Sequence, residues 1–455
     1  MPKPFNIIYF VCHDLGRHLG CYGHPVATPN IDAFARDGVL FEHAHCSSPA
    51  CSPSRACVMT GQYAHVHGCI GLSHMGWGLR PEIPTIVEHL SAAGYETAHV
   101  GTEHEWHPRS GRYDREGDRA WADWTTENAL EDARTFLRTR DNGQPFYLNI
   151  GTQEDHASEF TRPAVVESRY GGPIPADETF VPPYLEDNTP NREFLSNFQS
   201  AIRYLDKQWG AFMEFIRQSE YADNTLIIFS TDHGIAIPTD RPRCSKGTLY
   251  ERGTAISLAM RLPQGMKQGY RFDGLIPNID LTPTLLDMAG APIPDTVNGR
   301  SFWPLLQGQA YKRHEQIFTE RNYHGEKFEA GSADFVDFLD PIRSVRTEQY
   351  HYLRWFDPDA MAEPTLWAMR EVNDPHSHER LYDCLHDPMQ TIDLKRRPEY
   401  GAILADLRGR LERWMHDTDD WLLQSTTPIP PVRPEEPGWG EGWPLLAERV
   451  PWDGR

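Results

Sequence analysis

Three features that define common classes of protein are scarce or missing in this sequence. No apolar run approaches the roughly 20 residues that a membrane-spanning helix needs. Basic residues are outnumbered, because 44 Lys and Arg stand against 65 Asp and Glu and give a formal net charge of -21. The eight cysteines show no disulfide-framework spacing. These absences argue against a membrane protein, a nucleic-acid-binding protein and a small domain held by disulfides.

The cysteines also bear on the compartment. Free thiols in a chain of 455 residues are typical of a reducing environment. Residues 1–12 are too short and too polar at their edges for a signal peptide, and they predict a first strand instead. We therefore expect a cytoplasmic protein, or a periplasmic or secreted one if an export signal has been removed.

Apolar strands alternate with helical segments along most of the chain. Runs that are apolar throughout are typical of strands buried on both faces of a parallel sheet. Such a run occurs at residues 6–12, a further buried strand is predicted at 146–151, and strands are also predicted at 95–100 and 225–230. Amphipathic helices are predicted between them, and residues 157–189 read as a long surface excursion. The pattern predicts an α/β fold with a large, mainly parallel sheet sandwiched by helices.

The pattern changes near residue 336. Short strands are predicted at 342–346, 350–356 and 380–383, before a closing helix at 401–415. We predict an α/β domain over residues 1–335. A smaller α+β subdomain with an antiparallel sheet follows over residues 336–455 and ends in a Pro- and Trp-rich tail.

Polar clusters follow directly after several predicted strands. In open α/β sheets, ligands collect beyond the carboxyl ends of the strands, so these clusters are expected to form one site. Carboxylate oxygens such as those of Asp14 and Asp232 suit a hard cation, Ca²⁺ or Mg²⁺. The clusters are His13-Asp14, His104, His156 and Asp232-His233.

Residues 50–61, A-C-S-P-S-R-A-C-V-M-T-G, form the most distinctive stretch. A Pro near the start of a helix and a Gly at its end predict a short helix that begins close to Cys51. Arg55 follows one turn later on the same face. A thiol at a helix N-terminus beside a cation has a lowered pKa and attracts anions. The alternative is a buried free cysteine beside a surface arginine.

The motif C-S-P-S-R followed by T-G resembles the signature of the sulfatases, within the alkaline phosphatase superfamily. The resemblance extends over nearly the whole chain, through N-I-I-Y-F-V-C-H-D-L-G, T-L-I-I-F-S-T-D-H-G, K-G-T-L-Y-E and D-L-T-P-T-L-L-D-M-A-G. The segments around Cys51, residues 342–355 and W-M-H-D-T-D-D-W are most similar to heparan N-sulfatases (N-sulfoglucosamine sulfohydrolases).

The resemblance implies that a formylglycine-generating or sulfatase-maturing enzyme converts Cys51 to formylglycine, whose hydrated aldehyde is the nucleophile. It also implies one divalent metal ion, with Ca²⁺ preferred and Mg²⁺ or Mn²⁺ as alternatives. His13 stands where the family has an acid, so it either shifts the preference toward Mn²⁺ or Zn²⁺ or merely lies beside the site. The implied ligands are His13, Asp14, Cys51, Asp232 and His233.

Four further roles are implied by the same resemblance. Arg55 would hold the hydrate, and Lys246 would contact the sulfate and the leaving oxygen. His156 would protonate the leaving group, which an imidazole with a pKa near ~6.5 can do. His104 would help to break down the intermediate. A plain loop lysine and ordinary core or surface histidines are the alternatives.

The chain departs from the family pattern near the expected sulfate. Thr102 replaces a lysine, so one positive charge is missing unless Arg241 or Arg243 supplies it. Gln153 stands where relatives often have histidine. His324 is a candidate for binding the leaving group, although a plain loop fits equally well.

The resulting expectation is a hydrolase that releases sulfate from a sulfate ester or sulfamate, on a small or oligomeric sugar. The same nucleophile and metal would also serve a phosphonate monoester or phosphodiester hydrolase. A third reading is a non-catalytic binding protein in which Cys51 stays unconverted. No nucleic-acid or membrane partner is expected, and a homo-oligomer is compatible with the sequence.

Overall fold

The computed structural model of the chain describes residues 4–73, 77–105, 112–116, 125–141, 143–235, 246–323, 339–356 and 378–423. Within them, an eight-stranded sheet has the order β4-β3-β5-β1-β6-β7-β2-β8. Neighbouring strands are parallel except at β7, which is antiparallel to β6 and β2. The strands are β1 (Asn6–Cys12), β2 (Val39–His45), β3 (Glu96–Gly101), β4 (Arg115–Glu116), β5 (Phe146–Gly151), β6 (Thr225–Thr231), β7 (Leu258–Arg261) and β8 (Tyr270–Pro277).

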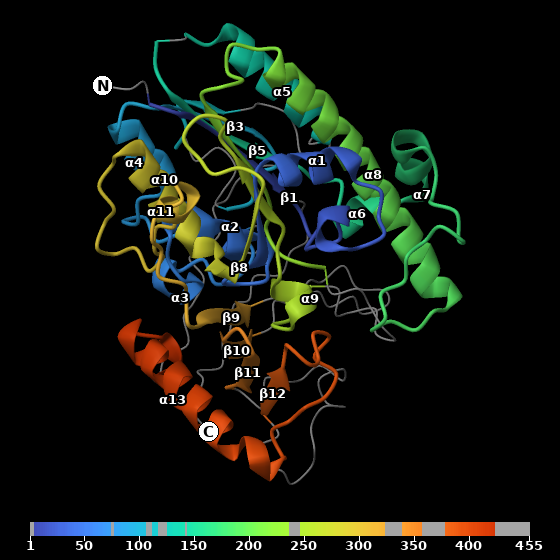
Figure 1. The fold of residues 1–455 in the computed structure, drawn as a ribbon, viewed down its shortest axis with the longest axis vertical. Helices are drawn as coiled ribbons and strands as arrows, with labels where there is room; N and C mark the ends of the chain where they lie inside the picture. The colour runs from blue at the N-terminus through green and yellow to red at the C-terminus, as the bar shows by residue number, and fades with distance from the viewer. Residues whose placement is uncertain are drawn as a thin grey trace, which may run out of the picture.

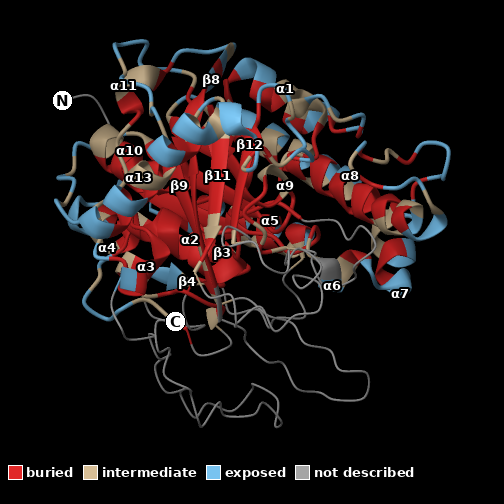
Figure 2. Cartoon of the chain, turned by 90° about the horizontal axis from the view of Figure 1, so that it is seen from below, coloured by how far each residue is buried: buried red, intermediate tan, exposed pale blue. Residues whose placement is uncertain are grey.

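Helices cover both faces of this sheet, which is why its central strands are apolar throughout. Ile8 and Phe10 of β1 pack toward one helix layer, and Ile7 and Tyr9 pack toward the other. Figures 1 and 2 show the two layers, with the buried sheet between them and the exposed residues on the outer helix faces. The predicted α/β sandwich is confirmed. The first layer contains α1 (Pro29–Asp37), α5 (Thr126–Thr139) and α8 (Thr189–Arg217), and the second α2 (Cys51–Thr60), α4 (Ile86–Ala92), α10 (Leu281–Ala289) and α11 (Trp303–Leu306).

Shorter elements connect these layers. Residues 157–170, predicted as part of a surface excursion, form helical turns whose side chains Phe160, Val165 and Val166 are buried. The sequence obscured them because Pro and acidic residues surround each apolar position. These elements are α3 (Ala64–His67), α6 (Ala157–Phe160), α7 (Pro163–Val165), a π-helical turn at Val166–Tyr170, α9 (Glu251–Thr254) and η5 (Asn278–Asp280).

A second sheet has the order β12-β11-β10-β9, and all of its neighbouring strands are antiparallel. The predicted antiparallel sheet is therefore confirmed. Helix α13 packs on it through apolar residues that include Leu407 and Leu411 (Figure 1). Its first strand precedes residue 336, so the predicted boundary falls between two paired strands. Its elements are β9 (Ile317–Tyr323), β10 (Leu339–Arg346), β11 (Tyr350–Trp355), β12 (Glu379–Asp383) and α13 (Gly401–Asp417).

Buried polar contacts join the two sheets. Glu320 of β9 accepts a hydrogen bond from the backbone N–H of His65 at 2.9 Å and lies 3.0 Å from the Nδ1 atom of that residue. Arg343 of β10 lies 3.5 Å from Glu320 and donates to Asp420 at 2.9 Å. All four side chains are buried. The contact of Glu320 with His65 of α3 joins the small sheet to the large unit, and Arg343, itself paired with Asp420, holds Glu320 in place from within the small unit.

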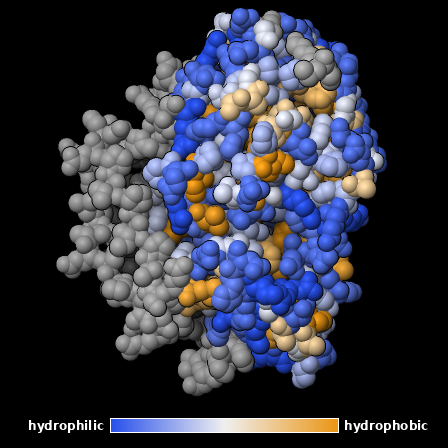
Figure 3. Space-filling view, turned by 90° about the vertical axis from the view of Figure 1, so that its left-hand side faces the viewer, coloured by the Kyte–Doolittle hydropathy of each residue, from blue (hydrophilic) through white to orange (hydrophobic). Residues whose placement is uncertain are grey.

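On the face seen in Figure 3, apolar residues occur in small scattered groups among hydrophilic ones. None of the helices in the described part of the chain is long and apolar enough to span a bilayer.

The fold predicts a large penalty for truncating Trp209 of α8. Its ring is fully buried, with ring centroids 4.9 Å from Phe10, 5.1 Å from Phe34 and 5.1 Å from Phe229. Trp209→Ala should lower the free energy of unfolding by about 3–5 kcal/mol because it leaves a cavity at the junction of α1, α8 and the central strands. Trp209→Phe, which keeps a ring there, should cost less than about 1.5 kcal/mol. Urea denaturation of both variants measures this, and equal losses would contradict the packing.

Candidate active site

Cys51 is the first residue of α2, a helix buried along its whole length. Ala50 before it is extended, and Gly61 after it adopts a left-handed φ of +67° that ends the helix. The helix is anchored by Ser54, whose hydroxyl donates to the carbonyl of Asp232, and by Asn278, whose amide donates to the carbonyl of Ser54 at 3.2 Å. These contacts hold Cys51 against the ends of the central strands.

The ends of β1 and β6 deliver the acidic residues. Cys12 and Thr231 are paired neighbours, so His13-Asp14 and Asp232-His233 leave the sheet side by side. The backbone N–H of Asp14 donates to Asp232 Oδ1 at 3.0 Å. Asp14 has a φ of +51°, which is uncommon outside glycine and directs its carboxylate toward α2.

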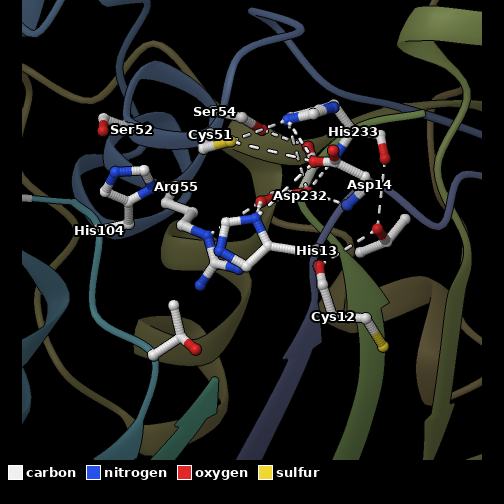
Figure 4. A network of polar contacts seen from close by, with 12 residues as sticks. Cys12, His13, Asp14, Cys51, Ser52, Ser54, Arg55, His104, Asp232 and His233 are labelled. Atoms are coloured by element: carbon white, nitrogen blue, oxygen red, sulfur yellow. Dashed lines mark hydrogen bonds and ion pairs between the residues drawn. The ribbon is translucent and has the colours of Figure 1, made fainter. Parts of the chain in front are cut away.

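Asp14, Cys51, Asp232 and His233 each place a potential ligand atom within 4.8 Å of the others (Figure 4). His233 Nε2 lies 3.3 Å from Cys51 Sγ, 3.3 Å from Asp14 Oδ1 and 3.7 Å from Asp232 Oδ1. His13, Asp14, Cys51 and His156 form a second group that meets the same limit. Because the two groups share Asp14 and Cys51, they describe a single centre.

The donor set fits a divalent cation. Two carboxylates are buried together, an arrangement that is costly without compensating positive charge. His13 is also buried, its Nδ1 lies 3.2 Å from Asp232 Oδ2, and neither ring nitrogen has a hydrogen-bond partner among the described residues. His13 is therefore placed at the centre, where its free nitrogens are suited to a metal ion.

The electrostatics of the centre favour ionised acids. Burial by itself would raise the pKa of Asp14, but Lys246 and His233 outweigh it and hold the pKa well below its usual range. Burial likewise opposes ionisation of Cys51, yet the same two residues bring the pKa of its thiol well below the usual value. For His233, burial would lower the pKa, and the charges of Asp232 and Asp14 instead raise it to about 10.

Lys246 is placed where the sequence predicts a sulfate contact. Its Nζ atom lies 3.3 Å from Cys51 Sγ, 3.3 Å from Asp14 Oδ2 and 2.9 Å from His156 Nε2. His156 in turn contacts the hydroxyl of Ser158 through Nδ1 at 2.7 Å. A cation and an imidazole therefore lie together on the side of Cys51 from which an anionic substrate could be held.

Arg55 lies deeper than a surface cation. It is 2% exposed, and its Nε donates to Asp232 Oδ2 at 3.0 Å. Nη1 lies 4.0 Å from Glu105 Oε1, and neither Nη atom makes a hydrogen bond within the described residues. Arg55 is thus fixed at one end, while its two outer nitrogens remain available to an oxyanion.

His104 and Thr102 approach from the end of β3. The ring centroid of His104 lies 5.8 Å from that of His13, and burial lowers the pKa of His104, which favours the neutral ring. Thr102 is buried and donates to Gln153 Oε1 at 3.3 Å. Arg241 and His324, the other two predicted substrate contacts, lie outside the described residues.

Two buried acids near the site were not anticipated. Glu105 lies beside Arg55 and accepts from the backbone N–H of His104 at 2.7 Å. Asp155 is fully buried, and neither of its oxygens has a hydrogen-bond partner in the described chain. Burial raises the pKa of Asp155, and the negative charge of Glu154 raises it further. In the sequence, only their positions next to His104 and His156 pointed to the site. Acidic residues are usually exposed, so their burial could not be predicted.

Another cluster, formed by His43, His45 and Glu251, does not favour a metal. Arg17 pairs with Glu251 Oε1 at 2.6 Å, and Arg346 lies 3.5 Å from Oε2. Two guanidinium groups already compensate this carboxylate, so a further cation would be repelled.

Comparison with known proteins agrees with this geometry. The family model described as Sulfatase matches residues 5–291, and the model described as N-sulphoglucosamine sulphohydrolase, C-terminal, matches residues 244–417. The chain is 27% identical to an ulvan-active sulfatase of Formosa agariphila, covering 95% of this chain and 84% of that protein. It is also 27% identical to human N-sulphoglucosamine sulphohydrolase, covering 92% of each. The solved structure of a 2-O GAG sulfatase superposes with a TM-score of 0.74 at 22% identity, covering 99% of both chains.

The chain belongs to the sulfatase family, because the family model spans more than half of it. The resemblance to the sulfatases that was predicted from the sequence is confirmed, including the similarity to N-sulphoglucosamine sulphohydrolase. The protein is accordingly a hydrolase of the sulfuric ester class.

The geometry predicts that Asp232 controls metal content. Asp232→Ala should weaken binding of Ca²⁺ at least about tenfold, because it removes one of the two buried carboxylates at the centre. Calorimetric titration of the metal-free protein, with the bound metal counted by elemental analysis, measures this independently of activity. Asp273→Ala on the exposed edge of β8 is the matched control. Full metal occupancy in Asp232→Ala would contradict the assignment.

Proposed function

We propose that the protein hydrolyses a sulfate ester or sulfamate on a sugar, using a formylglycine at position 51 and one divalent metal ion. The observation that carries this proposal is the surroundings of Cys51 Sγ. It lies 3.3 Å from Lys246 Nζ, 3.3 Å from His233 Nε2 and 3.9 Å from Asp14 Oδ1. The sulfur marks where the hydroxyl groups of a hydrated aldehyde would stand, facing the cation and the metal ligands.

The relatives support a sulfated or N-sulfated sugar as the substrate. Their names refer to ulvan and to N-sulphoglucosamine, both of them carbohydrates, and the second name also describes the C-terminal family model. Substrate screening should therefore begin with N-sulfated glucosamine and with sulfated oligosaccharides.

The proposed metal is held by Asp14, Asp232, His233 and His13 together with residue 51. When bound, the ion would offset negative charge on the oxygens of the transferred group. Ca²⁺ suits the carboxylate oxygens best, with Mg²⁺ as the other oxygen-binding candidate. The imidazole of His13 makes Mn²⁺ or Zn²⁺ the further alternatives to test.

The remaining side chains bind the anion and move protons. Lys246 orients one oxygen of the sulfate group, and the outer nitrogens of Arg55 are available to another. His156, 2.9 Å from Lys246 Nζ, is placed to protonate the leaving oxygen or nitrogen. His104, neutral at pH 7 because burial lowers its pKa, is placed to accept a proton when sulfate is released.

A phosphonate monoester or phosphodiester hydrolase remains the second candidate, since it would use the same nucleophile and metal. The neutral side chain of Thr102, in place of a cation, is the observation that favours it. A maturing enzyme in the host is required in either case.

Replacing the nucleophile tests the proposal. Cys51→Ala should reduce release of sulfate from aryl sulfates and sulfated sugars by at least about 10⁴-fold, because no other group can take its place. Cys57→Ala, one and a half turns along the same buried helix, should retain activity. Near-normal turnover by Cys51→Ala would contradict the proposal. A wild type whose Cys51 stays unconverted in a host with a maturing enzyme would favour a binding protein.

The role of His156 predicts a dependence on the leaving group. His156→Gln should lower kcat/KM for a sugar sulfate by roughly 10²–10⁴, because an alkoxide is a poor leaving group without a proton. For p-nitrophenyl sulfate the loss should be below about tenfold, since nitrophenolate leaves unprotonated. Steady-state kinetics with both substrates decides the point, and equal losses would mean that His156 only positions Lys246.

A further inference from the structure

We infer that Thr102 and Gln153 make the anion pocket selective for transferred groups that carry one negative charge rather than two. The inference rests on the proposed function for the position of the substrate, and it concerns a property of the pocket that can be measured by binding alone.

Thr102 and Gln153 directly follow the ends of two neighbouring strands, and each precedes one of the two candidate proton-transfer residues in the sequence. Strands β3 and β5 are parallel neighbours that end at Gly101 and Gly151, and the Thr102 N–H donates to the Gly151 carbonyl at 3.1 Å. A Cβ atom on Gly151 would come within 2.0 Å of the Thr102 carbonyl oxygen, so the close approach requires glycine. His104 and His156 follow Thr102 and Gln153 after two and three residues.

The pair presents a neutral donor. Thr102 donates its hydroxyl proton to Gln153 Oε1, which leaves the Gln153 amide nitrogen as the unused donor of the pair. This nitrogen is buried and has no hydrogen-bond partner among the described residues. The two outer nitrogens of Arg55 are also buried and have no hydrogen-bond partner among the described residues. Unpartnered buried donors call for an explanation, and a bound oxyanion supplies one.

Among the residues that the structure describes, the charged side chains around the nucleophile supply no net positive charge. Lys246 lies beside Asp14, and Arg55 lies beside Asp232 and 4.0 Å from Glu105. The positive charge offered to a substrate is therefore chiefly that of a bound divalent ion. Such a pocket matches a singly charged group better than a doubly charged one, because the second charge meets no additional cation.

This selectivity suits the proposed reaction. A sulfate ester carries one negative charge, and hydrolysis converts ROSO₃⁻ and water into ROH, SO₄²⁻ and H⁺. The charge of the pocket thus matches the singly charged sulfate ester better than the doubly charged sulfate ion, so the product is released more easily. Phosphate monoesters, whose second ionisation has a pKa near ~6, would be disfavoured for the same reason.

Two inorganic anions of similar shape provide the probe. Sulfamate ion, H₂NSO₃⁻, carries one charge and sulfate carries two, and neither titrates near neutral pH. Calorimetry on the metal-loaded protein should show that the wild type binds sulfamate at least as tightly as sulfate. Sulfate binding at least about tenfold tighter would overturn the inference and would favour Arg241 or Arg243 as the source of a further cation.

A substitution at Thr102 then tests the cause. Thr102→Lys should change the ratio of the two dissociation constants at least about tenfold in favour of sulfate, because it adds one unit of positive charge at the end of β3, two residues before His104. Thr102→Met, of similar length and neutral, should leave the ratio within about twofold of the wild type. Gln153→Leu should weaken both anions without changing their ratio. An unchanged ratio in a folded Thr102→Lys variant would overturn the inference.

The outcomes separate this inference from the proposed function. Because binding is measured without turnover, absence of sulfatase activity together with the expected preference would contradict the proposed function alone. Sulfatase activity together with a preference for sulfate would contradict the inference alone. If Thr102→Lys does not fold, the wild-type ratio still decides the inference.

Discussion

Two carboxylates buried side by side, those of Asp14 and Asp232, are the constraint on which the rest of the site depends. The pairing of β1 with β6 brings them together, and the hydrogen bond from the Asp14 N–H to Asp232 fixes their separation at one end. Buried negative charge of this density requires cations. Lys246 approaches one carboxylate and Arg55 the other, and potential ligand atoms of both carboxylates and Cys51 gather within 4.8 Å, where we propose a divalent ion.

The fold serves this arrangement through its parallel strands. Because β3, β5, β1 and β6 all end at the same edge, side chains that are far apart in sequence converge there. Helix α2 brings Cys51 to that edge from the layer on one face, and its complete burial leaves the residue little freedom to move. The second sheet is fixed to this unit by Glu320, which accepts a hydrogen bond from the backbone N–H of His65 in α3 and whose burial makes separation costly.

Much of the fold could be predicted from the sequence because the central strands are apolar on both faces. The predicted runs at residues 6–12 and 146–151 coincide with β1 and β5. The outer strand β8 was missed because Gly274 interrupts its short run and Pro277 ends it, and both residues are typical of turns. Strand β9 was missed for a different reason, because Glu320 at its centre looks exposed in sequence and is buried through an ion pair with His65.

The residues of the site likewise fall into those that could be predicted from the sequence and those that could not. Residues that follow directly after strands, such as Asp14 and Asp232, could be predicted from position alone, and the structure places them together. The partners of these residues could not. The pairing of Arg55 with Asp232 and its approach to Glu105 depend on how α2 packs against strands more than 40 residues away in sequence. Long-range packing of this kind leaves no local pattern.

The most direct test of the central claim is the mass of the tryptic peptide that ends at Arg55, from active protein made in a cell that possesses a formylglycine-generating enzyme. The account predicts a peptide lighter than the cysteine form by the difference between a thiol and an aldehyde, with the extent of conversion matching the specific activity. An active preparation in which this peptide carries only an intact thiol would contradict the account.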